Sequence, residues 1–268
     1  MSIVRRNNVH VVGSGEQAMI LAHGYGCDQN MWRYLVPAFA GRFRVVLFDY
    51  VGAGQSDLSA YRPARYATLD GYASDVLEIC DELRITDAIF VGHSISAMIG
   101  VRAAILEARR FDRLVHIAPS ARYMNDDGYR GGFSRVEIEE LLNFLDENHL
   151  GWSHMMAPLI MGNPERPELA KELENSFCRT DPDIARRWAR VCFLCDCRDD
   201  LPVVPVPSLV LQCRQDVIAP YEAGHYVHEN LPDSRFVLLD ATGHCPHLSH
   251  PDQVAAAMEP FVSRESLS

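Results

Sequence analysis

The chain has 268 residues, 48% of them hydrophobic and 23% charged, a composition typical of a globular protein and unlike that of disordered, collagen-like or coiled-coil chains. Its formal net charge of −11 argues against a nucleic-acid partner, because nucleic-acid-binding domains normally carry a basic excess. No apolar run approaches the ~18 residues of a membrane helix, and residues 1–7 lack the apolar segment of a signal peptide. We therefore expect no membrane interaction, a cytoplasmic location and eight cysteines that remain thiols.

Short β-branched runs alternate with helical stretches along most of the chain, which favours a mostly parallel α/β sheet flanked by helices. Most of the expected strands are apolar throughout, as strands covered on both faces are. These strands are Val9–Val12, Met19–Ala22, Val45–Phe48, Ala88–Val91, Leu114–Ala118, Leu209–Gln212 and Phe236–Leu239. The expected helices between them include Tyr72–Leu83, Ala97–Ala108, Tyr221–Asn230 and Asp252–Val262.

The alternation stops between residues 120 and 200, where no strand pattern is found and helix starts recur. Ser134 and Glu137 have the spacing of a capping box, and Asp181 precedes Pro182 as an N-cap precedes proline at the first helical position. We predict about four short helices here, inserted between two strands as a cap over an active site. The predicted organisation is a core of residues 1–119 and 201–268 with a cap of residues 120–200.

The segment Val91–Ala97 follows an expected strand and opens an expected helix, the context of a nucleophile elbow. Gly92 satisfies the need for a small residue before Ser94, whereas Ser96 replaces the second glycine of the usual G-x-S-x-G pattern. The alternative is a structural serine that caps a helix. In the α/β-hydrolase fold the acid and the base follow the serine in that order, and Asp216 and His244 each follow an expected strand.

These three residues together predict a Ser94–Asp216–His244 catalytic triad, in which His244 accepts the serine proton and Asp216 orients the imidazole. Other carboxylates could replace Asp216, but three fall at the end of the helical insert and one lies only four positions before His244, so we prefer Asp216. The alternatives are Asp196, Asp199, Asp200 and Asp240.

An oxyanion hole requires backbone N–H groups directed at the developing negative charge. The segment His23–Gly26 follows an expected strand at the place of the donor loop, so we assign the N–H groups of Tyr25 and Ile95; a plain turn is the alternative. We expect His23 and His93 to pack beside the site rather than to act in catalysis.

The sequence does not favour a metal or nucleotide site. Cys192, Cys195 and Cys197 lack a second cysteine pair or a histidine in a suitable loop, which favours a thiol-lined apolar pocket over zinc. The residues after His244 include His247 and His250 but are interrupted by a proline. The glycines near Gly52 lack dinucleotide-binding spacing. We expect no metal ion and no cofactor.

The insert is rich in apolar side chains, and four short helices cannot bury all of them among themselves. We therefore expect some to face Ser94 and to form a mostly apolar pocket. The expected substrate-binding residues are Tyr25, Trp152, Met156, Val191 and Leu194, with Trp152 and Met156 the strongest candidates.

Several segments together resemble the RsbQ group of α/β hydrolases, to which the plant karrikin and strigolactone receptors are similar. RsbQ is a bacterial regulator of the energy-stress branch of sigma-B activation and works with a PAS-domain phosphatase. The segment Ile95–Ala97 is closer to the plant receptors than to the Val-Gly-Ala expected of RsbQ. The segments that carry the resemblance are residues 23–29, 48–57, 68–72, 91–94, 151–152, 180–182, 208–213 and 243–251.

The resemblance implies an α/β-hydrolase fold with a four-helix cap, the same triad, a closed apolar pocket for a small ester or lactone, and a signalling output. From the residues we predict a carboxylesterase-type serine hydrolase that acts through an acyl-enzyme on a small hydrophobic ester or lactone. The alternative is a ligand-responsive regulator that binds or slowly hydrolyses a small signal and recruits a PAS-domain phosphatase.

Overall fold

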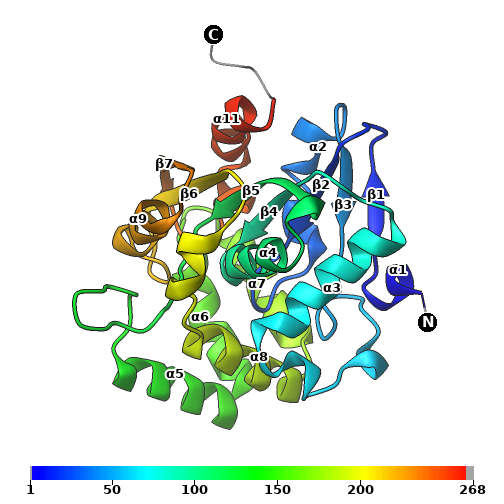
Figure 1. The fold of residues 1–268 in the computed structure, drawn as a ribbon. Helices are drawn as coiled ribbons and strands as arrows, with labels where there is room; N and C mark the ends of the chain where they lie inside the picture. The colour runs from blue at the N-terminus through cyan, green and yellow to red at the C-terminus, as the bar shows by residue number, and fades with distance from the viewer. Residues whose placement is uncertain (1, 264–268) are drawn as a thin grey trace.

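The structure is a computed structural model that describes residues 2–263. Within these residues seven strands form one sheet in the order β1-β3-β2-β4-β5-β6-β7 (Figure 1), and every neighbouring pair is parallel except β1 and β3. The predicted mostly parallel α/β fold is therefore confirmed. The strands are β1 His10–Val12, β2 Ala18–Ala22, β3 Arg44–Leu47, β4 Ala88–His93, β5 Phe111–Ile117, β6 Ser208–Gln215 and β7 Ser234–Thr242.

Burial differs between the middle and the edges of the sheet. Every residue of β2 and β4 is buried, because helices cover both faces of these strands. The short edge strand β1 is exposed throughout, and only two residues of the other edge strand, β7, are buried. The expectation of apolar, fully covered strands thus applies to the interior of the sheet.

Two layers of helices cover the sheet (Figure 1). Residues of α2 and α11 pack on one face, whereas α3, α4 and α9 contribute to the larger cluster on the other face. These helices are α2 Val36–Phe39, α3 Leu69–Glu82, α4 Ile95–Leu106, α9 Tyr221–Asn230 and α11 Pro251–Val262. Shorter elements are α1 Ile3–Arg6, α10 Pro246–Ser249 and the 3₁₀ segments Gln29–Trp32, Leu58–Ala60, Arg65–Ala67, Ala108–Arg110 and Arg198–Val203.

Four helices inserted between β5 and β6 form a cap, and they lie together on one side of the molecule (Figure 1). Both predicted helix starts are present. Ser134 and Glu137 make the two reciprocal bonds of a capping box, and the Asp181 carboxylate accepts hydrogen bonds from two N–H groups of the first turn of α8. Such caps stabilise a helix by about 1 kcal/mol each. The helices are α5 Arg135–Glu147, α6 His149–Met161, α7 Pro167–Arg179 and α8 Pro182–Leu194.

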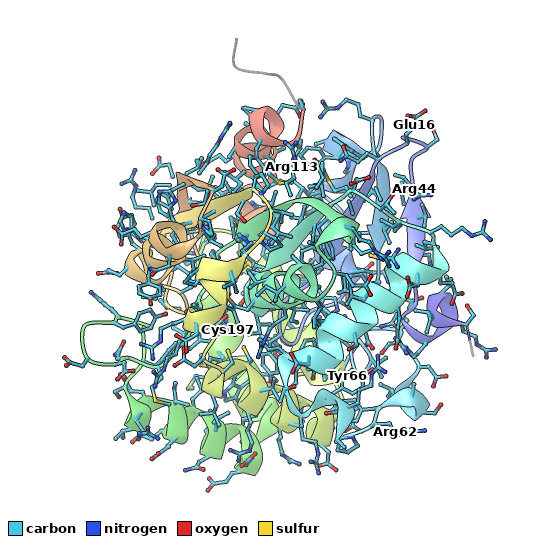
Figure 2. All side chains as sticks on the ribbon, in the orientation of Figure 1. Glu16, Arg44, Arg62, Tyr66, Arg113 and Cys197 are labelled. Carbon is cyan, nitrogen blue, oxygen red and sulfur yellow. The ribbon has the colours of Figure 1, made fainter. Side chains whose placement is uncertain are left out.

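Aromatic packing and hydrogen bonds attach the cap to the core. Trp188 of α8 is fully buried and stacks on Tyr72 of α3, with ring centroids 5.1 Å apart. Tyr66, labelled in Figure 2 near this junction, continues the aromatic contact to Tyr72 at 5.0 Å. The Ser176 hydroxyl donates to the Gly26 carbonyl at 2.8 Å. The predicted cap is therefore present; its exact limits at residues 120 and 200 stay a prediction. None of the helices within residues 2–263 is both long and apolar enough to cross a membrane.

Candidate active site

Ser94 lies at the sharp turn between β4 and α4, and its backbone has φ 57° and ψ −125°. A positive φ is a strained conformation for a residue with a side chain. Gly92 is required at this turn, because a Cβ atom on it would lie 2.4 Å from the Ser96 carbonyl oxygen. Ser96 is accommodated because its hydroxyl donates to the His23 carbonyl and lies 3.1 Å from the Tyr50 hydroxyl.

The predicted triad residues are within hydrogen-bond distance in series. The His244 Nε2 atom lies 2.7 Å from Ser94 Oγ, and the Nδ1 atom lies 2.7 Å from Asp216 Oδ2. The other Asp216 oxygen accepts hydrogen bonds from the N–H groups of Ile218 and Ala219 at 2.8 and 3.1 Å. The Asp216 carboxylate therefore orients Nδ1–H toward itself and leaves Nε2 free to accept the serine proton.

The carboxylates considered as alternatives to Asp216 lie elsewhere. Asp196 pairs with Arg122 and Arg198, Asp200 with Arg102 and Asp240 with Arg214. Asp199 is exposed. Asp216, by contrast, lies within hydrogen-bond distance of His244, and its role as the acid of the triad stays a prediction.

Two further histidines are buried beside the triad and support its loops. His93 lies with Nε2 2.8 Å from the His244 carbonyl oxygen, so Nε2–H donates to the backbone of the predicted base. His23 Nε2 accepts the Tyr50 N–H at 3.2 Å, and Nδ1–H donates to the Gly24 carbonyl at 2.9 Å. Burial lowers the pKa of both rings, and that of His93 well below its usual value. Both therefore remain neutral, as packing residues would.

The loop expected to form the oxyanion hole lies directly against the elbow. A Cβ atom on Gly24 would lie 3.2 Å from the Ser94 Cβ atom, so the absence of a side chain at Gly24 allows the loop to approach the serine this closely. Ile95 is the first residue of α4, where an N–H group has no acceptor within its own helix. The assignment of the Tyr25 and Ile95 N–H groups as donors stays a prediction.

A narrow, mostly apolar cavity of about 30 Å³ lies over Ser94, which is space for about two water molecules. The expected residues Tyr25 and Trp152 line it. The remaining lining residues come from both the core and the cap: Cys27, His93, Ser94, Tyr123, Ile160, Leu173, Phe177, Cys192, Phe193, Ile218, His244 and Cys245.

Three expected substrate-binding residues lie elsewhere, which corrects the sequence-based expectation. Val191 and Leu194 line a separate surface hollow of about 390 Å³, because the inward face of α8 is formed by Trp188, Cys192 and their neighbours. Met156 lines a groove of about 440 Å³ on the outside of the cap, between α5 and α6. That groove shares Trp152 and Ile218 with the cavity over Ser94.

Tyr123 is a site residue that the sequence analysis did not identify. Its hydroxyl lies 3.1 Å from Ser94 Oγ, and its side chain is fully buried. The sequence feature that could have identified Tyr123 is its position six residues after β5, at the strand edge where α/β active sites form. The side chains that fill the cavity from the cap, including Phe177 and Phe193, carried no comparable signal.

The cysteines are free thiols. Cys192 lines the cavity over Ser94, whereas Cys195 and Cys197 line the surface hollow beneath α8; Figure 2 labels Cys197 near the cap. Burial raises the pKa of the Cys192 thiol, which therefore stays protonated. Within residues 2–263 no group of three metal-ligating side chains is arranged to hold a metal ion.

Comparison with known proteins identifies the family of the chain. A model described as "Alpha/beta hydrolase family" matches residues 19–257. The chain belongs to the α/β-hydrolase family. It is 39% identical over 264 residues to strigolactone esterase D14 of Arabidopsis thaliana, covering 98% of each chain. It is also 39% identical to Karrikin insensitive 2 receptor CA of Petunia hybrida, over 256 residues and 95% of each chain.

A solved structure shares the fold closely. The hydrolase olei00960 from Oleispira antarctica superposes with a TM-score of 0.96 at 41% identity, over 98% of this chain and 96% of that chain. Within the α/β hydrolases, the chain therefore belongs with the relatives named as strigolactone esterases and karrikin receptors. The resemblance to that group is confirmed, whereas a specific likeness to RsbQ and its phosphatase partner stays a prediction.

Proposed function

We propose that this protein is a serine hydrolase of the carboxylesterase type that acts on a small hydrophobic ester or lactone. The observation that carries the proposal is the hydrogen-bonded series Ser94–His244–Asp216 at the floor of an apolar cavity. The names of relatives about 40% identical support it, since two of them are a probable esterase and a strigolactone esterase.

The proposed reaction has two stages. Ser94 Oγ attacks the acyl carbon while its proton passes to His244 Nε2, and the protonated His244 then returns that proton to the departing alcohol or lactone oxygen. Water, deprotonated by His244, hydrolyses the resulting acyl-enzyme. The N–H groups of Tyr25 and Ile95 are the proposed donors to the carbonyl oxygen in both stages. No step requires a metal ion or a cofactor.

The dimensions of the cavity favour a small substrate. At about 30 Å³ the cavity must widen to admit an ester, and the aromatic side chains of Trp152, Phe177 and Phe193 are the groups that would move. Their apolar character favours hydrophobic acyl groups over charged ones, because a buried charge without a partner is costly. We accordingly propose small esters or lactones and exclude polymeric substrates.

A second function is a ligand-responsive regulator in which binding or slow turnover of a small signal recruits a protein partner. The printed names of several relatives as receptors support this alternative. The partner would be a PAS-domain phosphatase if the likeness to RsbQ extends to its interaction. For either function we propose a cytoplasmic location.

Hydrolysis of p-nitrophenyl acetate by the wild type and Ser94→Ala tests the proposal and separates the two functions. The hydrolase interpretation predicts many turnovers per site for the wild type and none for Ser94→Ala. A single burst of one product per site followed by slow release favours the regulator. Turnover by Ser94→Ala at the wild-type rate would contradict both.

A further inference from the structure

Ser94 Oγ has two hydrogen-bonding neighbours rather than one. His244 Nε2 lies 2.7 Å away on one side, and the hydroxyl of Tyr123 lies 3.1 Å away. Tyr123 follows β5, outside the proposed triad and oxyanion loop, yet its hydroxyl is as near to the attacking atom as an oxyanion donor would be to its acceptor.

The positions of the protons determine which hydroxyl donates in the hydrogen bond between Ser94 and Tyr123. The Nδ1–H group of His244 is directed at Asp216, so Nε2 is an acceptor and takes the single proton of the Ser94 hydroxyl. Ser94 therefore has only lone pairs to offer to Tyr123, and the Tyr123 hydroxyl must be the donor. Burial raises the pKa of Tyr123 well above its ordinary value, so the hydroxyl retains its proton through the working pH range.

The ring of Tyr123 is held in place from several sides. It packs edge-on against Phe193 with ring centroids 5.5 Å apart, and its backbone carbonyl accepts the Phe133 N–H at 3.1 Å. Cys192 lines the same cavity. A donor fixed in this way needs little rearrangement when charge develops on its acceptor.

We propose that Tyr123 is a further catalytic residue, whose hydroxyl donates to Ser94 Oγ and stabilises the negative charge that this oxygen carries during the reaction. In acylation the Oγ–H bond breaks and the proton passes through His244 to the departing oxygen, while the bond from Oγ to the acyl carbon replaces the bond from that carbon to the departing oxygen. In deacylation water gives a proton to His244 and its oxygen to the acyl carbon, the Oγ–carbon bond breaks, and Oγ takes that proton from His244. Tyr123 keeps its own proton throughout. This role rests on the proposed serine hydrolysis.

The test compares wild type with Tyr123→Phe, which removes the hydroxyl and retains the ring. The readouts are the second-order rate constant for inactivation by a small fluorophosphonate, and the burst and steady-state rates with p-nitrophenyl acetate. A hydrogen bond to a charged group is worth enough to lower the inactivation rate and both ester rates by about 10- to 100-fold. KM should change little, because the bond strengthens only as charge develops.

Tyr129→Phe is the matched control. Its hydroxyl donates to the Arg122 carbonyl at 2.7 Å, so its loss loosens the same loop without touching the serine. We expect its inactivation rate to stay within about twofold of wild type. The inactivation rate constant is measured only on molecules that react, so partial misfolding of a variant leaves it unchanged.

Three results would overturn the inference, each in a different way. Inactivation of Tyr123→Phe at the wild-type rate would remove Tyr123 from the mechanism while leaving the hydrolase proposal intact. An equal loss in Tyr129→Phe would attribute the effect to loop packing. A wild type that fluorophosphonate does not label at Ser94 would overturn the proposed function itself, and with it the role of Tyr123.

Discussion

The strand-end loops and the cap differ in how they form the site. The loops after β4, β6 and β7 place Ser94, Asp216 and His244 in contact by backbone geometry: a positive φ at Ser94 and N–H groups that hold the Asp216 carboxylate. The cap contributes shape through packed aromatic side chains such as Trp188 and Trp152. Chemistry is therefore specified by the loops, and access and fit by the cap.

The largest loss of activity is expected from a substitution in the strand-end loops. Asp216→Asn should lower kcat/KM for p-nitrophenyl acetate by about 10⁴-fold, because an amide in this position no longer holds Nδ1–H of His244 and favours the wrong tautomer. The thermal unfolding midpoint should remain close to that of wild type. Asp240→Asn is the matched control, since Asp240 pairs with Arg214 on the surface. A loss below tenfold in Asp216→Asn would contradict the role of Asp216.

The core should also be the region that acid destabilises. Burial lowers the pKa of His247 to about 3 and of His116 to about 4, and lowers the pKa values of His23 and His93. The unfolded chain binds these protons below the usual histidine pKa of about 6.5, whereas the folded state does not. The contribution of these neutral histidines to the free energy of unfolding should therefore be fully present above about pH 6.5 and should decrease as the pH falls below that value.

Each of these four histidines lowers the free energy of unfolding by at most ~1.4 kcal/mol for every pH unit below about 6.5, down to its folded pKa. Urea unfolding between pH 7 and 4.5 measures how steeply the free energy of unfolding depends on pH. His116→Asn, away from the triad, should make this dependence less steep. A free energy of unfolding that stays constant over this range would show that the histidines titrate in the folded state, contrary to their burial.

Within the cap, stability should depend on which face of α8 is changed. Trp188→Ala should lower the free energy of unfolding by about 3–5 kcal/mol, because it empties a fully buried site between the cap and α3. Leu194→Ala, on the same helix but 51% exposed, should change it by less than about 0.5 kcal/mol. Equal losses, measured by urea unfolding at pH 7.5, would show that the inward face of α8 has been assigned wrongly.

The smallest expected effect concerns substrate fit. Trp152 separates the cavity over Ser94 from the outer groove. Trp152→Ala should therefore shift the preferred acyl chain by one or more methylenes, each worth about tenfold in kcat/KM. A series of p-nitrophenyl esters from acetate to octanoate measures the shift. Val191→Ala, in the separate surface hollow, should keep the wild-type profile. An identical profile in both variants would mean that Trp152 does not limit acyl length.

The same contrast explains what could be predicted from the sequence. Ser94, Asp216 and His244 each follow a strand whose apolar run is visible in the sequence, and the sheet brings those strand ends together. The helices of the cap were also predictable, through local signals such as the capping box at Ser134. Local patterns do not specify which side of a short helix faces the core, so Met156, Val191 and Leu194 were expected in a cavity that they do not line. Tyr123 was not predicted because its contact with Ser94 depends on how the segments after two different strands come together in the fold, which no local sequence pattern specifies.

The most direct test of the central claim is the identity of the residue that an ester acylates. Wild type mixed with p-nitrophenyl acetate, quenched in acid within the burst and digested, should yield a peptide with one acetyl group on Ser94. Asp216→Asn should yield far less in the same time, and Ser94→Ala none at that position. An unmodified Ser94 peptide, or acetyl on Cys195 with turnover intact, would contradict the account.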